Sequence, residues 1–309
     1  MSGLKATLFG RFKVERDDRQ QIEGMEARKV QELLSYLLVH FERPQPREML
    51  AELLWENLPP EKSKKNLRQT LWKLKSALDD RHVPGFPNVL VDIDWIQLNP
   101  DGDWWLDTAE FERIYARFKN NRARDLDEDS FLYLQQAVDL YQGDLLEGWY
   151  QEWCISERER FQAMYLLLLN KLVQYCEIHQ KCEIGLAFGE KLLRHDRAYE
   201  RAHRQLMRLY FLAGDRTGAL RQYQRCAAAL KEELDVEPSE RTVLLYEQIK
   251  TEHFHRSKYP TGKDGRKISG PAVEEPASRL DEFADTLLNI PSQLQAETNL
   301  IKKGLQPGQ

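Results

Sequence analysis

The sequence has none of the features that anchor a chain in a membrane or cross-link it outside the cell. The longest apolar run, Tyr165–Leu169, falls far short of the roughly 20 residues that a spanning helix needs. Residues 1–9 lack the basic start and the long apolar stretch of a secretory signal. The chain has only four cysteines, and no two form a Cys-x-x-Cys pair: Cys154, Cys176, Cys182 and Cys226. We therefore expect buried, free thiols and a cytoplasmic protein.

Motifs of catalysis are missing as well. The sequence contains no Gly-x-x-x-x-Gly-Lys-Ser/Thr loop, no Gly-x-Gly-x-x-Gly, no Gly-x-Ser-x-Gly and no His-Glu-x-x-His. Two spacings resemble metal-ligand pairs, His253-x-His255 and Cys176-x5-Cys182, but neither fits a zinc template. We therefore predict that the chain is not an enzyme and has no catalytic, cofactor-binding or metal-binding residues.

The chain is long enough for two domains and a smaller segment. Its 309 residues exceed the roughly 100–200 of a typical domain. With 41% hydrophobic and 31% charged residues, the composition is that of a helix-rich globular protein, and the formal net charge is −5. The apolar pattern predicts a mainly α fold with a small β component, divided into a winged helix-turn-helix domain (1–103), a tetratricopeptide-like helical domain (104–255), a flexible linker (256–279) and a tail (280–309).

The order of strand and helix patterns in the first region is that of a winged helix. Apolar and polar residues alternate over residues 4–23, which predicts short antiparallel strands. Two β-prone runs, 88–91 and 95–98, predict a hairpin near the end of the region. Between them, leucines recur with helical spacing in three segments: about 27–40, 47–55 and 61–79. In a winged helix of this order, the third helix is the one presented to the DNA major groove.

The third predicted helix concentrates positive charge. From Glu61 to Arg81 there are seven Lys/Arg against three Asp/Glu. Its leucines lie at i, i+4, i+7 and i+11, on one stripe that faces the core: Leu67, Leu71, Leu74 and Leu78. The opposite face and its flanks carry the cationic, amide, hydroxyl and aromatic groups that contact phosphates and base edges. The candidate DNA-binding residues are Lys62, Lys65, Arg68, Gln69, Thr70, Trp72, Lys73 and Ser76. A solvated helix face is the alternative interpretation.

The second region has the pattern of a helical repeat. Amphipathic helices run from Asp107 to Ile249, and Gly185-Leu186 aligns with Ala219-Leu220 at an offset of 34 residues, the tetratricopeptide period. Two of these helices, 199–213 and 217–234, form a hairpin of the kind that stacks into a concave surface. Partner binding by that surface and plain self-packing of the helices both remain open.

The end of the chain has a different composition. Residues 256–279 hold three prolines, three glycines and few large apolar residues, as expected for a linker. Residues 280–290 then have apolar side chains at helical spacing. Docking on the repeats, recruitment of another protein and a remnant of a longer chain are the alternatives for this segment.

Motifs in both regions resemble the Streptomyces antibiotic regulatory protein family, over about residues 4–250. They comprise Arg28–Leu38, Pro46–Leu50 and Asn66–Leu78 in the first region, and Asp107–Glu112, Ala137–Leu146, Glu157–Arg160 and Leu234–Pro238 in the second. The resemblance implies a winged helix of the response-regulator type followed by a bacterial transcriptional activator domain. It also implies double-stranded promoter DNA with direct repeats as the target.

We therefore predict a DNA-binding transcriptional activator that inserts helix 61–79 into the major groove. Its helical domain is expected to self-associate, as a homodimer on DNA, or to contact RNA polymerase. Residues 1–105 alone are expected to retain DNA contact. Because residues 1–100 carry 16 Lys/Arg against 15 Asp/Glu, only a local patch favours DNA. The alternative is a tetratricopeptide-type adaptor whose winged helix does not bind DNA.

Overall fold

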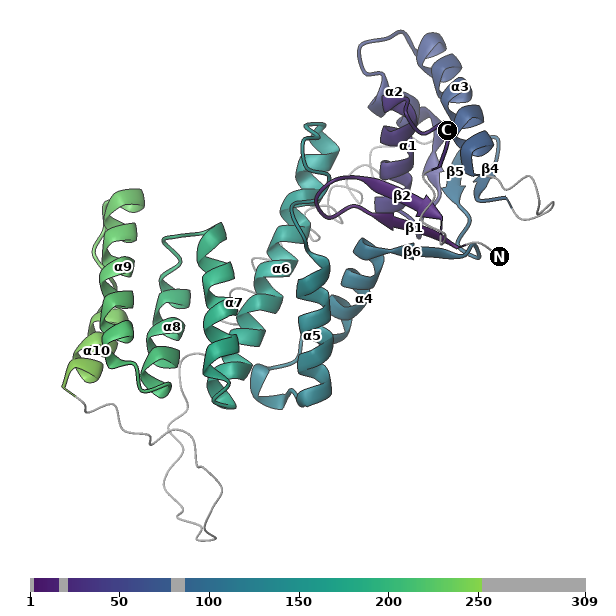
Figure 1. The fold of residues 1–309 in the computed structure, drawn as a ribbon. Helices are drawn as coiled ribbons and strands as arrows, with labels where there is room; N and C mark the ends of the chain where they lie inside the picture. Colours follow the sequence, from purple (N-terminus) through teal and green to yellow (C-terminus); the bar gives the residue numbers. More distant parts are fainter. Residues whose placement is uncertain (1–2, 17–21, 79–86, 252–309) are drawn as a thin grey trace, which may run out of the picture. The chain divides into compact units, whose positions relative to one another are not determined.

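The fold begins with a three-stranded sheet to which the N-terminal end and a much later strand contribute (Figure 1). Strand β1 (Leu4–Thr7) pairs antiparallel with β2 (Lys13–Arg16) and parallel with β6 (Trp104–Leu106). Leu4 and Ala6 of β1 are buried, in agreement with the alternation in the sequence. The N-terminal strand is therefore held on both sides, once by a strand about 100 residues further along the chain.

The computed structural model describes residues 3–16, 22–78 and 87–251. These residues belong to a unit that comprises residues 1–258. The predicted linker and tail, and the His253-x-His255 spacing, lie outside the described residues.

A second small sheet forms the wing. Strand β5 (Trp95–Leu98) lies between β3 (Gln45–Pro46) and β4 (Val89–Val91) and is antiparallel to both. The hairpin of β4 and β5 confirms the prediction from the two β-prone runs. Strand β3 was not predicted, because two residues are too few to show an alternating pattern.

Three helices and a leucine-rich core complete the winged helix. They are α1 (Arg28–Val39), α2 (Arg47–Leu54) and α3 (Pro60–Leu78), and each end lies within one residue of its prediction. Pro46 immediately precedes α2 and Pro60 opens α3, where the missing N–H group leaves no hydrogen bond unmade. The predicted mainly α fold with a small β component is therefore confirmed.

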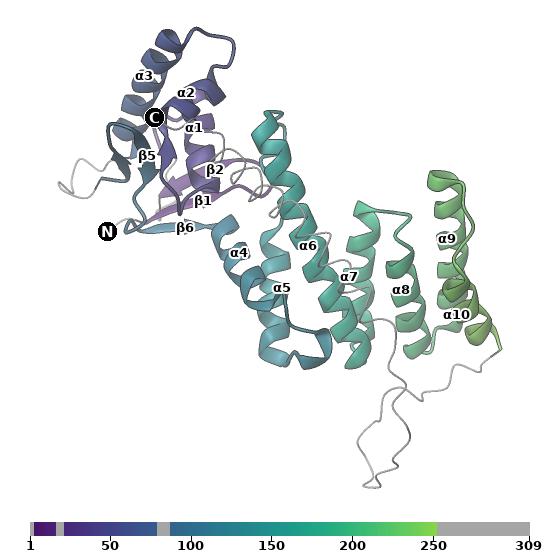
Figure 2. The ribbon, with the colours of Figure 1, turned by 180° about the vertical axis from the view of Figure 1, so that it is seen from behind.

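The rest of the described chain is an array of helices. In chain order they are α4 (Asp107–Phe118), the short 3-10 helix η1 (Ala123–Asp125), α5 (Glu128–Leu140), α6 (Glu152–Ile178), α7 (Cys182–His195), α8 (Glu200–Leu212), α9 (Arg216–Leu234) and α10 (Glu240–Lys250). Figures 1 and 2 show α6 to α9 side by side in sequence order. The offset of 34 residues relates α7 to α9, in which Gly185 and Ala219 are both buried.

Two glycines let α7 approach its neighbours closely. A Cβ atom added at Gly185 would lie 2.7 Å from the Cβ atom of Cys176 on α6, and one at Gly189 would lie 2.4 Å from Leu206 Cδ2 on α8. Both distances are shorter than carbon atoms tolerate. Of these two glycines, Gly185 is the one in the 34-residue alignment, and the close packing of α7 on α6 requires it.

The sheet of β1, β2 and β6 is bonded directly to the helical array. After β1, the carbonyl oxygen of Leu8 accepts a hydrogen bond from Leu146 N (2.8 Å), and that of Gly10 accepts one from Glu147 N (2.8 Å). The N–H group of Gly10 donates to Asp144 O (2.9 Å). The segment that precedes α6 therefore extends the pairing that begins in β1.

Buried side chains strengthen this junction. The ring of Phe9 packs edge-on against Phe111 of α4 and Phe161 of α6, with ring centroids 5.3 Å apart in each case. The buried carboxylate of Asp107 accepts hydrogen bonds from the N–H groups of Leu8 (2.8 Å) and Phe9 (2.9 Å). Because β6 lies beyond the boundary predicted at 103/104 and pairs with β1, the two regions share one hydrophobic core.

The cysteines are free, as the sequence predicted. Cys154, Cys176 and Cys226 are buried, whereas Cys182 is partly exposed. Burial raises the pKa of Cys176 and that of Cys226 to about 12, so both thiols stay protonated at neutral pH. Within the described part of the chain, every helix is too short or too polar to cross a membrane.

Candidate nucleic-acid interface

Helix α3 presents one face to the core and the other to solvent. All four leucines of the predicted stripe are buried. Near the start of the helix the buried hydroxyl of Ser63 donates to the carbonyl oxygen of Trp55, at 3.2 Å, which ties α3 to the end of α2. The rotation of α3 about its axis is therefore fixed by apolar burial along its length and by a polar contact in its first turn.

Seven of the eight candidate DNA-binding residues lie on the solvent face. Trp72 is the most exposed large apolar residue of the helix, at 69%. The exposed candidates are Lys62, Lys65, Arg68, Gln69, Trp72, Lys73 and Ser76. The structure thus brings together on one surface the cations, the amide and the indole that the sequence singled out.

Thr70 is a correction to the predicted set. Its side chain is only 8% exposed, because position 70 lies three residues after Leu67 and four before Leu74. At this spacing it belongs to the stripe that faces the core. The buried stripe is wider than the leucines alone indicated, and the Thr70 side chain belongs to it.

The cations of α3 differ in their pairing. Lys64, which was not among the candidates, forms an ion pair with Glu48 of α2 at 2.6 Å. This contact raises the pKa of Lys64 and lowers the pKa of Glu48. Among the described residues, no acidic side chain lies within 4.0 Å of the four candidate cations Lys62, Lys65, Arg68 and Lys73. The charge of these four candidates is therefore available to an external anion, as is that of Lys75 in the last turn of α3.

A shallow depression of about 600 Å³ lies between the starts of α2 and α3 and the wing turn. Arg47 holds the turn in place, because its N–H donates to Asp94 O and its Nη1 atom donates to Asp92 O, each at 2.9 Å. Lys64 and Arg68 line the depression from α3. Sequence reasoning missed Arg47, whose role depends on a contact 45 residues away along the chain.

The wing turn itself is acidic and carries an exposed apolar side chain. Ile93 is 86% exposed and lies between Asp92 and Asp94, both of which are exposed. Two carboxylates at this turn repel DNA phosphates. In the described part of the first region, positive charge is therefore offered by α3 and not by the wing.

Comparisons with known proteins agree with this arrangement. Residues 106–250 match the bacterial transcriptional activator domain family. A search of curated proteins finds no match. A similar solved structure is Mycobacterium tuberculosis EmbR in complex with a low affinity phosphopeptide, with 17% identity, a TM-score of 0.68, and coverage of 96% of this chain and 72% of that chain. At this identity the structural likeness concerns the fold.

The fold and the family match together give a winged helix followed by a bacterial transcriptional activator domain, the order that the motifs predicted. The second domain therefore belongs to the bacterial transcriptional activator domain family, as the motifs of the second region predicted. The activator domain begins at residue 106, within β6, and ends at residue 250, the last residue of α10.

Proposed function

We propose that this protein activates transcription by inserting α3 into the major groove of promoter DNA, while its activator domain contacts RNA polymerase or a second copy of the chain. The observation that carries the proposal is the solvent face of α3, where four cations without acidic partners surround Gln69 and Trp72. If this face were purely a solvated surface, the large apolar ring of Trp72 would remain exposed to water, whereas contact with a partner would bury it.

The side chains of this face divide into two roles. Lys62, Lys65, Arg68 and Lys73 neutralise phosphates, which supplies affinity for any sequence. Gln69 and Trp72 project toward the base edges, where an amide pairs with adenine and an apolar ring contacts the methyl group of thymine. The preference for particular bases then depends on two residues, Gln69 and Trp72.

The proposal is tested by a binding titration on duplex DNA at several salt concentrations. Lys65→Ala is expected to weaken cognate and scrambled duplexes alike and to reduce the slope of log K against log salt by about one. Lys119→Ala removes the same charge from an exposed position just after α4 and serves as the matched control. Parent-like salt dependence of Lys65→Ala would remove Lys65 from the phosphate contacts, and parent-like binding of all single variants at 65, 69, 70, 72 and 73 would remove α3 from the interface.

A protein-binding adaptor is the second candidate, and the acidic wing turn favours it. An exposed isoleucine between two aspartates suits a cationic protein surface better than DNA. In that case no duplex binds even at low salt, whereas the activator domain still binds its protein partner. A gel-shift series that starts at low salt separates the two candidates.

A further inference from the structure

One face of α1 runs along the segment that leads into α6. Residues at i, i+4 and i+8 of a helix share a face. Three such residues of α1 meet every second residue of the segment 149–153: Arg28 contacts Trp149, Glu32 contacts Gln151 and Tyr36 contacts Trp153. We call these three residues of α1 the junction stripe.

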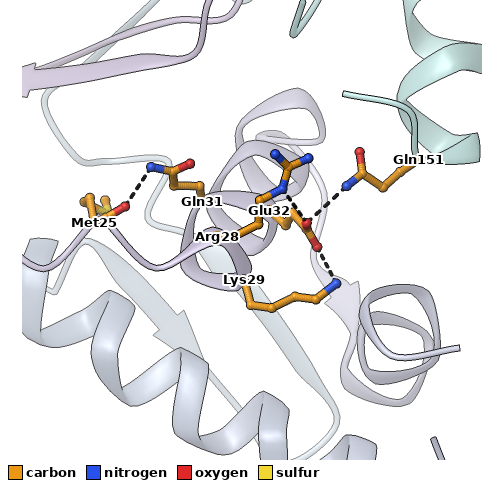
Figure 3. A network of polar contacts seen from close by, with 6 residues as sticks. All are labelled: Met25, Arg28, Lys29, Gln31, Glu32 and Gln151. Carbon is orange, nitrogen blue, oxygen red and sulfur yellow. Dashed lines mark hydrogen bonds and ion pairs between the residues drawn. The ribbon is translucent and has the colours of Figure 1, made fainter. Parts of the chain in front are cut away.

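Glu32 is the central and most buried member of the junction stripe. Glu32 is only 3% exposed, yet its side chain carries a carboxylate. Figure 3 shows its three donors: Arg28 Nε at 3.1 Å and Lys29 Nζ at 2.6 Å from its own helix, and Gln151 Nε2 at 3.1 Å from the segment before α6. The two cations neutralise the buried charge. The amide of Gln151 is the donor that reaches Glu32 from the activator domain.

The two outer residues of the junction stripe, Arg28 and Tyr36, also fix the position of α1 along the segment 149–153. The guanidinium of Arg28 lies 4.9 Å from the centroid of the Trp149 ring, and the rings of Tyr36 and Trp153 meet edge-on at 5.1 Å. Both are orientation-dependent contacts that a shift of one turn along α1 would break.

The junction is costly in unsatisfied polar atoms. In the described part of the chain, five buried side-chain atoms lack a hydrogen-bond partner, and three lie on α1 or in the segment 149–153: Ser35 Oγ, Gln151 Oε1 and Trp153 Nε1. Apolar side chains of similar size would avoid this cost. A buried polar contact of this kind acts on which arrangement forms, since other registers leave Glu32 without its amide.

We infer that Glu32 is a positioning residue, which through Gln151 fixes the winged helix on the activator domain in one orientation. Helix α1 packs on α3 within the leucine core, so the orientation of α1 sets that of the DNA-reading helix. The inference rests on the proposed function for its consequence: DNA held by α3 and a partner held by the activator domain then keep a fixed relation, and recruitment is lost when this relation is loosened.

The test uses the full-length chain with a swapped pair of side chains. Gln151→Glu places a second carboxylate against Glu32 and replaces a hydrogen bond by repulsion. In the double variant Glu32→Gln, Gln151→Glu, a carboxylate at position 151 again faces an amide donor at position 32. Gln136→Glu adds the same negative charge as Gln151→Glu at an exposed position of α5 and is the matched control.

Three quantities are measured for each variant. They are the affinity for the duplex that the parent chain selects from a random library, the transcript yield of purified RNA polymerase at saturating regulator, and hydrogen exchange of the amides in α1 and residues 149–155. For Gln151→Glu we expect affinity within about twofold of the parent, about tenfold less transcript, and faster exchange confined to the junction. The double variant is expected to recover most of the transcript and the slow exchange.

The outcomes separate this inference from the proposed function. A parent chain that neither binds DNA nor activates refutes the proposed function, while the exchange data still test the junction. Parent-like exchange and transcript in Gln151→Glu overturn the positioning role. So does a double variant as defective as Gln151→Glu, or a loss of DNA affinity as large as the loss of transcript, which would indicate unfolding.

Discussion

Cutting the chain after residue 105 is expected to destabilise the winged helix instead of releasing an autonomous DNA-binding domain. The cut removes Leu106, the last residue of β6, and with it the helices that cover Leu8 and Phe9. Both side chains are buried in the full chain. The expectation drawn from the sequence, that residues 1–105 alone contact DNA, did not include these contacts because they come from residues beyond 105.

The size of the effect follows from what becomes exposed. Burial of a large apolar side chain contributes about 1.5–3 kcal/mol, so Leu8 and Phe9 together lose about 3–6 kcal/mol. The Asp107 carboxylate that accepts from their N–H groups is lost as well, although water replaces it in the fragment. Against a total stability of about 5–15 kcal/mol for a domain, this loss is a large fraction, and at the lower end of that range it removes all of the stability.

Thermal unfolding of fragments measures this loss. A loss of 3 kcal/mol lowers the midpoint by more than about 12 °C for a domain of about 100 residues. We expect fragment 1–105 to melt at least that far below fragment 1–195, which keeps α4 to α7 and all partners of Leu8 and Phe9. A fragment 1–105 that melts cooperatively at the temperature of fragment 1–195, and binds DNA as well, would refute the reasoning.

Two further predictions concern single side chains. Gln69→Ala should cost about 1–3 kcal/mol on the cognate duplex, far less on a scrambled one, and leave the salt slope unchanged, because an amide reads bases and carries no charge; equal losses on both duplexes would instead assign base reading to Trp72. Burial lowers the pKa of His203, which donates from Nε2 to Arg197 O and accepts at Nδ1 from Gln222. On acidification, His203 therefore takes up its proton at a lower pH in the folded state than in the unfolded state. The stabilising contribution of the neutral imidazole is present above about pH 6.5 and is lost as the pH falls through the lowered pKa. In urea titrations at several pH values His203→Gln should lose less stability than the parent on acidification, and the exposed control His195→Gln should behave as the parent.

Local patterns in the sequence predicted the elements of this fold well, because they record burial along a single helix or strand. The leucine period and the prolines placed α1, α2 and α3 within one residue. The same reasoning placed seven candidate residues on the exposed face of α3. It failed at Thr70, where a small polar side chain on the buried stripe resembles a surface residue by composition.

Pairing between distant segments was beyond the reach of such patterns. Gln151 lies 119 residues from Glu32, and Lys64 lies 16 residues from Glu48. No periodicity connects these positions, and a glutamate on α1 fits equally well on an exposed face. Glu32 is nonetheless buried in the complete chain, where Gln151 of the segment before α6 donates to its carboxylate.

The limited reading surface of α3 bears on why the two domains are fixed to each other. In the proposed function, Gln69 and Trp72 are the base-reading residues, and one helix with two such residues distinguishes only a few base pairs, each worth about 1–3 kcal/mol. The wing turn adds no cation in the described residues, since Asp92 and Asp94 flank its tip. Selection of a promoter among roughly 10⁶–10⁹ competing sites then needs a second contact, made by another copy on a neighbouring repeat or by polymerase. Such a contact adds to specificity only if its geometry relative to α3 is constant, because a loose connection dilutes the effective concentration of the second site. The junction stripe of α1 is placed to supply that constancy.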